Sequence, residues 1–228
     1  MKRHIHVIMN RKTFLQHLGL VAGGTVCLSS TAAPRYFLTA LSGTKAIVVD
    51  YALCTGCRTC EAVCSASNHK VEIAGVALPG IGNPAQSNIK VWRYNPPADI
   101  PVTCFLCEDA PCVAACPVKP DPKTGRKALY RDENLQTIKC DANRCIGCQS
   151  CSDACRENRG QVLWPDDEGS PTGMCTLCHG DPQCVQWCPY GALSFLEITP
   201  DMPHREMHPD MIASLMQEKF YDTKKIQK

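Results

Sequence analysis

The stretch CTGCRTCEAVC at residues 54–64 returns as CIGCQSCSDAC at residues 145–155, a shift of 91 positions. Both stretches have the spacing C-x2-C-x2-C-x3-C. Two other groups of four cysteines have a wider middle gap and a final proline, as C-x2-C-x4-C-x3-C-P and C-x2-C-x5-C-x3-C-P. The four quartets are Cys54, Cys57, Cys60 and Cys64; Cys104, Cys107, Cys112 and Cys116; Cys145, Cys148, Cys151 and Cys155; and Cys175, Cys178, Cys184 and Cys188.

This spacing is typical of ligands to [4Fe-4S] clusters. Three thiolates on a short looping backbone can bind three irons of a cube, and the fourth thiolate, one helical turn further on, points away. In two-cluster bacterial ferredoxins that outlying cysteine binds the other cluster. The glycines of CTGC and CIGC suit a backbone that passes close to inorganic sulfide. The sixteen quartet cysteines therefore predict four [4Fe-4S] clusters.

Other uses of cysteine fit the pattern less well. Disulfide frameworks belong mostly to small exported domains and have irregular spacing. Zinc sites use C-x2-C pairs but seldom a third cysteine two residues later. CTLCH at residues 175–179 matches a c-type haem attachment signature, but haem there would leave Cys184 and Cys188 without a role. We therefore expect His179 to be a loop residue beside a cluster.

The repeat also predicts the fold. Aligning Cys54 with Cys145 aligns Ile47 with Ile138 and places Cys140 opposite Val49, so Cys140 is expected in a strand and not among the ligands. Short apolar runs, KALYR at 127–131 and GALSF at 191–195, follow the two proline-bearing quartets. Each half then has the order strand, ligand loop, short helix, ligand loop, strand. We predict an α+β fold of two ferredoxin-like modules from an internal duplication, with long loops.

Segments outside the quartets have simpler interpretations. Residues 74–88 are rich in glycine and proline and predict a loop, whereas the alternation in IKVWRY at 89–94 predicts a strand. PDMIASLMQEKF at 209–220 predicts a helix with Met211, Ile212, Leu215 and Met216 on one face, which either closes the domain or docks on another subunit. The acids Glu61 and Asp153 are expected at solvated helix positions.

The two ends of the chain differ from its centre. Residues 1–43 combine a basic start, the twin-arginine-like sequence NRKTFLQ and a weakly apolar stretch, so they predict an export signal or an N-terminal anchor. An exported protein would be periplasmic or on the outer face of the cytoplasmic membrane; one that keeps this segment as an amphipathic helix would be cytoplasmic. Residues 44–200 form the predicted four-cluster domain, and residues 201–228 a C-terminal tail with the predicted docking helix.

Composition excludes several functions. The formal net charge of +2 gives no electrostatic case for nucleic acid. No stretch is apolar and long enough for a confident membrane span. The chain lacks GxGxxG, P-loop, nucleophile-elbow and HExxH motifs. We therefore predict no catalytic residue and no enzyme activity of the chain by itself.

The quartets resemble the four-cluster iron–sulfur subunits of molybdopterin and tungstopterin oxidoreductases, the dimethyl-sulfoxide-reductase-type electron-transfer subunits. The resemblance covers about residues 45–200 and lies in the cysteine spacing. It implies that the first quartet pairs with the fourth and the second with the third. The implied ligand sets are Cys54, Cys57, Cys60 with Cys188; Cys175, Cys178, Cys184 with Cys64; Cys104, Cys107, Cys112 with Cys155; and Cys145, Cys148, Cys151 with Cys116.

The resemblance implies a function as well. The chain would pass single electrons between a large molybdo- or tungstopterin catalytic subunit and a quinone-linked or cytochrome acceptor. Two alternatives stay open: a soluble polyferredoxin that works alone, and an electron-transfer subunit of a hydrogenase. A zinc or disulfide scaffold with no redox role is a third, which a colourless preparation would support.

Overall fold

The computed structural model describes residues 43–160 and 162–221. The predicted export signal or anchor, apart from Gly43, lies outside the described residues. In chain order the elements are β1 (Lys45–Val49), α2 (Thr59–Asn68), β2 (Val71–Ile73), β3 (Val76–Leu78), η1 (Pro84–Gln86), β4 (Lys90–Tyr94), β5 (Ala98–Val102), α3 (Pro111–Ala114), β6 (Leu129–Arg131), β7 (Ile138–Cys140), α4 (Ser150–Arg159), β8 (Trp164–Pro165), β9 (Pro171–Thr172), η2 (Leu177–Gly180), α5 (Gln183–Gln186), β10 (Leu193–Glu197) and α6 (Pro209–Phe220).

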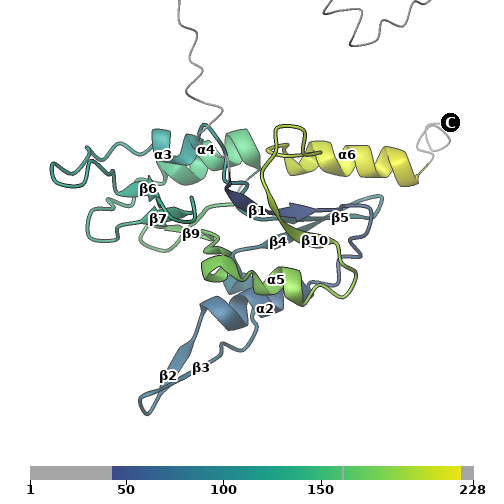
Figure 1. Cartoon of the computed structure of the whole chain (residues 1–228), viewed down its shortest axis with the longest axis horizontal. Coiled ribbons are helices and arrows are strands. Elements are labelled where there is room, and N and C mark those ends of the chain that lie inside the picture. Colours follow the sequence, from purple (N-terminus) through teal and green to yellow (C-terminus); the bar gives the residue numbers. More distant parts are fainter. Residues whose placement is uncertain (1–42, 161, 222–228) are drawn as a thin grey trace, which may run out of the picture. The chain divides into compact units, whose positions relative to one another are not determined.

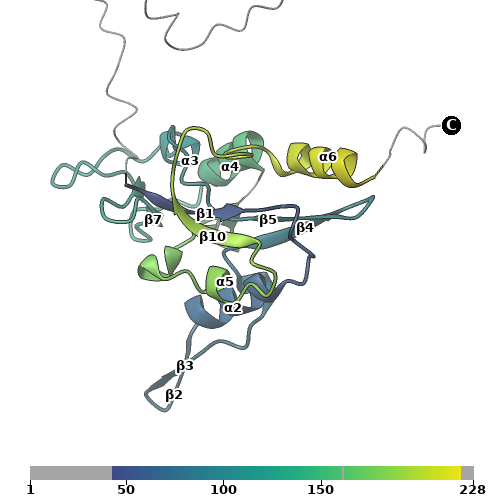
Figure 2. The same ribbon diagram turned by 45° about the vertical axis from the view of Figure 1, so that its right-hand side comes forward.

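Strand pairing crosses the two sequence repeats. The strand before the first quartet, β1, pairs antiparallel with β10, which follows the fourth quartet. The strand after the second quartet, β6, pairs with β7, which precedes the third. Helices follow the same rule, because α2 lies against α5 and α3 against α4 (Figures 1 and 2). The outer quartets thus share one group of elements and the inner quartets another.

The two repeated stretches have the same backbone conformation. α2 and α4 are both ten residues long, and their bounds differ by the same 91 positions as the repeat. Each is preceded by a residue in the left-handed region, Arg58 with φ 60° and Gln149 with φ 62°. The ligand loops and helices are therefore local structures that the sequence specifies twice.

The β4–β5 hairpin contributes buried side chains to the core of the described residues. Its two strands pair from Lys90↔Val102 to Tyr94↔Ala98. The side chains of Val91, Ile100 and Val102 are buried in the same core as the cysteines Cys60, Cys64, Cys112 and Cys155. A chain with only 6% aromatic residues thus builds its core largely from aliphatic side chains and thiols.

The segment 74–88 contains more structure than a loop. Val76–Leu78 pairs with Val71–Ile73 to form the β2–β3 hairpin, which projects away from α2 (Figure 1). All six strand residues are exposed. The hairpin therefore lacks the alternation of buried and exposed side chains by which a strand is predicted from sequence. Ala74 and Gly75 both have positive φ and form its tight turn.

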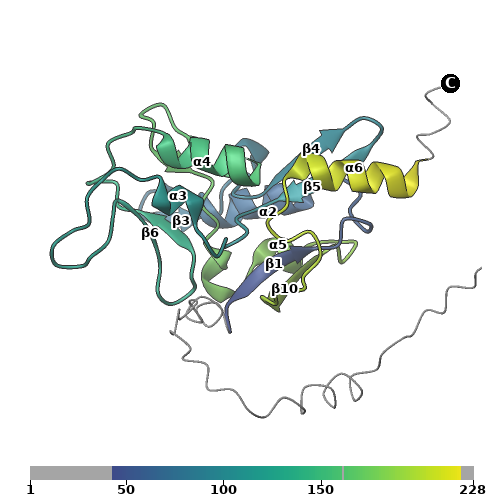
Figure 3. The ribbon, with the colours of Figure 1, turned by 90° about the horizontal axis from the view of Figure 1, so that it is seen from above.

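Helix α6 begins and ends as the sequence predicts, but only part of the predicted face is buried. Ile212 and Met216 are buried, whereas Met211 is 58% and Leu215 41% exposed. The helix packs against β5, seen from above in Figure 3. Two hydrogen bonds join it to the same region. Tyr94 Oη donates to Asp210 Oδ1 at 2.7 Å, and Gln217 Nε2 donates to Pro96 O at 2.8 Å. α6 therefore closes this part of the fold; docking on another subunit stays a prediction for its exposed side.

The prediction of a solvated Glu61 is wrong. Glu61 is only 2% exposed. Its Oε1 accepts a hydrogen bond from the Val91 amide at 2.7 Å, and its Oε2 pairs with Arg58 at 3.3 Å. The carboxylate is buried because the β4–β5 hairpin covers α2, a contact that the local sequence does not reveal. Asp153 is half exposed and pairs with Arg156 on the surface of α4.

Among residues 43–160 and 162–221, no helix is both long and apolar enough to cross a membrane.

Replacing Glu61 by alanine should destabilise the protein, because the buried Val91 amide loses its acceptor. The expected loss is about 1–3 kcal/mol in the free energy of unfolding. Asp153→Ala is the matched control, since its exposed ion pair should contribute about 0.5 kcal/mol or less. Anaerobic guanidinium denaturation followed by circular dichroism measures both; equal effects of the two substitutions would contradict the structural role of Glu61.

Candidate metal centres

The first group of thiols comes from the first and the fourth quartet. Cys54 and Cys57 precede α2, Cys60 lies in its first turn, and Cys188 lies after α5; all four line one pocket. Burial raises the pKa of Cys60 to about 12, with further rises from Glu61 and the Cys54 thiolate. Cys57 is exposed. These are the four cysteines that the resemblance assigns to one cluster.

The second group joins the end of the first quartet to the fourth. Burial raises the pKa of Cys184, and the thiolates of Cys175, Cys64 and Cys178 raise it further, so these four sulfurs are neighbours. Asn68 Nδ2 lies 3.6 Å from Cys64 Sγ and 3.8 Å from Cys178 Sγ. This group also corresponds to one of the implied ligand sets.

The third group lines a second pocket. Cys104, Cys107 and Cys112 lie around α3, and Cys155 comes from α4. Burial raises the pKa of Cys112 to about 12, and the nearby thiolates of Cys155 and Cys107 add to the rise. The α3–α4 contact brings this set together.

The fourth group lies around Cys140 at the end of β7. Burial is the main cause that raises the pKa of Cys140 to about 12. The nearby thiolates of Cys145, Cys151 and Cys116 add to the rise. Cys148 is exposed, and its charge contributes to the raised pKa of Cys151. Cys140 is in a strand, as expected, but it is half buried and forms a fifth thiol beside this set. No spacing in the sequence indicates that proximity.

Electrostatic influence links each group of thiols to the next. The Cys60 thiolate raises the pKa of Cys184, which links the first group to the second. The Cys175 thiolate raises the pKa of Cys104, which links the second to the third. The Cys151 thiolate raises the pKa of Cys112, which links the third to the fourth. Each group therefore lies near the next, and we call this arrangement the single file.

The donor set fits iron–sulfur clusters. Among the described residues all cysteines are free thiols. Several sulfurs accept backbone hydrogen bonds, from Asn88 N to Cys64 Sγ at 3.3 Å and from Val162 N to Cys155 Sγ at 3.4 Å. Such bonds stabilise thiolates and tune cluster potentials. Burial together with repulsion from neighbouring thiolates raises the pKa of Cys60, Cys112 and Cys184, and bound cations would relieve both costs.

The loop glycines meet a requirement that was not predicted. Gly56 and Gly147 have φ of +66° and +65°. A Cβ at Gly56 would clash with the Asp99 carboxylate, and one at Gly147 with the Glu168 carbonyl. The loop thus packs against a protein neighbour on this side; an approach to inorganic sulfide stays a prediction.

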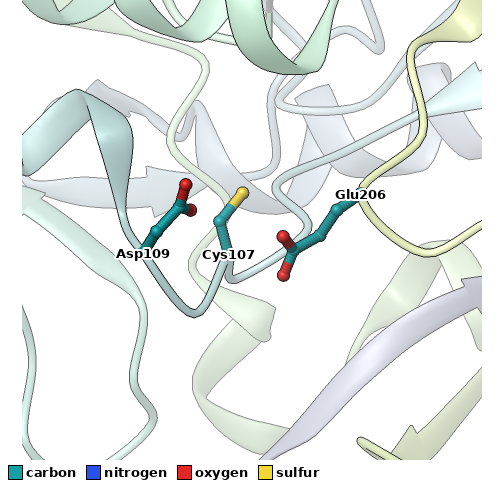
Figure 4. Close-up of side chains that lie close together, drawn as sticks. All are labelled: Cys107, Asp109 and Glu206. Atoms are coloured by element: carbon teal, nitrogen blue, oxygen red, sulfur yellow. The ribbon is translucent and has the colours of Figure 1, made fainter. Parts of the chain in front are cut away.

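A charged cluster beside the third group was not foreseen. The sulfur of Cys107 and carboxylate oxygens of Asp109 and Glu206 lie within 4.8 Å of one another (Figure 4). Arg159 pairs with both acids, at 3.0 Å and 3.1 Å. Burial and Glu206 raise the pKa of Cys107 to about 11, and Arg159 opposes this rise. Glu206 lies about a hundred residues from Cys107 in the chain, so no local sequence signal could connect them.

These thiol sets define the class of iron–sulfur electron carriers. No family model matches the chain. It is 35% identical to the polyferredoxin-like subunit of an aliphatic sulfonate oxidoreductase from Pyrococcus furiosus, over 59% of this chain and 66% of that subunit. It is 33% identical to YsaA of Escherichia coli K12, a proposed electron transport protein, over 70% of this chain and 94% of YsaA. It is 32% identical to the thiosulfate reductase electron transfer subunit PhsB of Salmonella typhi, over 62% of this chain and 70% of PhsB.

The chain therefore belongs to the family of ferredoxin-like iron–sulfur electron-transfer proteins and subunits. It spans slightly less than two thirds of the Pyrococcus subunit.

Gly147→Ala should destabilise the protein more than Gly125→Ala does. Both residues have positive φ, near 65–68°, so both substitutions bear the left-handed cost of about 1–2 kcal/mol. Only Gly147 has a backbone atom where the new Cβ would lie, whereas Gly125 has open space. Denaturation midpoints and iron content measure the effect. Similar losses in both variants would show that conformation alone, and not the contact with Glu168, requires glycine here.

Proposed function

We propose that the sixteen quartet cysteines hold four [4Fe-4S] clusters and that the chain relays single electrons along them. The ligand sets are those implied by the resemblance. The observation that carries the proposal is the single file of four thiol groups, each drawn from two quartets and each near enough to the next to raise the pKa of one of its thiols. A bound cluster supplies a site that accepts and returns one electron. Close spacing of such sites is what a relay requires.

The chain's own residues give the file two exposed ends and a covered middle. Cys57 in the first group and Cys148 in the fourth are exposed. In the middle groups Cys175 is buried, and the neighbouring Leu106 and Leu177 are 0% and 2% exposed. Apolar burial keeps water from the inner sites, so electrons would enter and leave at the ends.

We propose that one end docks on a catalytic subunit. Trp187 is 62%, Tyr190 53% and Leu53 49% exposed, and Tyr190 lines the pocket of the first group beside Cys188. Exposed apolar side chains around a redox site favour burial by a partner over life as a free carrier. The names of two relatives place them as subunits of a sulfonate oxidoreductase and a thiosulfate reductase, and the cysteine pattern resembles subunits that serve molybdo- or tungstopterin enzymes.

The competing function is a soluble polyferredoxin that works alone. Native anaerobic purification separates the two. A subunit would elute with a larger pterin-containing protein, and a quinone-linked or cytochrome acceptor would exchange electrons with that complex. A free carrier would elute as a monomer.

We further propose that residues 1–43 direct export. A mature chain shortened at its N-terminus in the periplasmic fraction would support export, and the full chain in the cytoplasm would refute it.

Cys64→Ser tests the ligand assignment. Cys64 lies in the first quartet but beside Cys175, Cys178 and Cys184, so its loss should damage the cluster of the fourth quartet and leave that of Cys54 intact. Iron content and the electron paramagnetic resonance spectrum of the reduced protein report the damage. Cys140→Ser is the matched control and should retain four clusters. Damage confined to the cluster of Cys54, or cluster loss in the control, would contradict the assignment.

A further inference from the structure

Asn68 and Arg159 occupy equivalent positions in the two repeats. Each is the last residue of its ligand-bearing helix, α2 or α4, and the two are 91 positions apart. Each stands four residues after the final cysteine of its quartet, Cys64 or Cys155. The side chain at this position therefore extends from the helix that ends one quartet toward the quartet that supplies the rest of the ligand set.

Asn68 directs a neutral donor at two sulfurs of the second group. Its Nδ2 donates one hydrogen to Cys64 O at 2.9 Å, which leaves the other for the sulfurs of Cys64 at 3.6 Å and Cys178 at 3.8 Å. The Thr176 hydroxyl donates to Asn68 Oδ1 at 2.8 Å. That hydrogen bond holds the amide with its nitrogen toward the thiols.

Arg159 directs a cation at the third group. It lines the same pocket as Cys104, Cys107, Cys112 and Cys155, and its side chain is 16% exposed. Asp109 and Glu206 hold its Nη2 at 3.0 Å and 3.1 Å. Its Nε is buried and has no hydrogen-bond partner in the described part of the chain. A donor left unpaired at a pocket of thiols is available to sulfur bound there.

We propose that Asn68 and Arg159 are positioning residues that raise the reduction potentials of the two inner clusters, Asn68 by hydrogen bonding and Arg159 by charge and hydrogen bonding. The inference rests on the proposed ligand assignment. Reduction adds one negative charge to a cluster and its thiolates. A nearby donor or cation stabilises the reduced form more than the oxidised form, which raises the potential. Glu206 has the opposite sign and lowers the potential of the cluster beside Cys107.

The charged cluster in Figure 4 is not itself a metal site in this account. Its two carboxylates are paired with Arg159, and its sulfur belongs to the ligand set of the third group. The acids instead anchor the guanidinium. Glu206 also links the segment before α6 to this cluster, because its Oε1 accepts the Glu108 amide at 3.1 Å.

The test is a redox titration followed by electron paramagnetic resonance on the full chain, with iron and sulfide content measured on each sample. Arg159→Gln should lower one of four midpoint potentials and leave the other three unchanged. Glu206→Gln should raise that same potential. Arg159→Lys keeps the charge and should shift it less than Arg159→Gln does. Asn68→Asp replaces the donor by an anion and should lower a different one of the four.

Arg156→Gln is the matched control. Arg156 is on the same helix and carries the same charge, but its side chain is 52% exposed and pairs with Asp153. Equal shifts in Arg156→Gln and Arg159→Gln would mean that only net charge matters, and no shift in Arg159→Gln and Glu206→Gln would overturn the inference. Should Arg159→Gln fail to assemble, the sign of the Glu206→Gln shift decides. Wild-type protein with fewer than four clusters would instead refute the proposed function, and the inference with it.

Discussion

Buried thiolates must be close to positive charge, and this constraint organises the whole chain. Among the described residues, eight of the buried core side chains are quartet cysteines, including Cys60, Cys112, Cys151 and Cys184, and large aromatic side chains are few. Left as thiols, they fill space as small apolar groups but supply little of the area that stabilises a domain of this size. Ionised and bound to iron, they become covalent links between distant segments. Metal binding and folding are then coupled, as in other small metal-rich domains.

The proposed crossed use of quartets agrees with the fold. In that assignment each ligand set takes thiols from two segments, and α5 lies against α2 and α3 against α4 as the assignment requires. In each repeat, the last residue of the ligand-bearing helix, α2 or α4, then lies beside cysteines of the partner quartet. Asn68 and Arg159 are there, one neutral and one charged. If the proposal holds, duplication of a motif would allow equivalent sites to diverge in reduction potential without a change in ligands.

Local features of the structure could be predicted from the sequence, because they depend on spacing within a few residues. The strands around residues 47 and 138, the strand at 89–94 and the helix at 209–220 are all present where the pattern indicates them. Features that depend on distant contacts could not be predicted. Glu61 is buried by a hairpin thirty residues away, Gly147 is restricted by Glu168, and Arg159 is anchored by Glu206. Half of the apolar face predicted for α6 is exposed, because β5 covers only one side of the helix.

The most direct test of the central claim is an iron anomalous-difference map from crystals of anaerobically prepared protein. The account predicts four compact iron sites in a single file, in the order set by the proximity of Cys60 to Cys184, Cys175 to Cys104 and Cys151 to Cys112. It also predicts that Cys188 binds the site nearest Cys54. Fewer than four sites, or a site whose four ligands all come from one quartet, would contradict it.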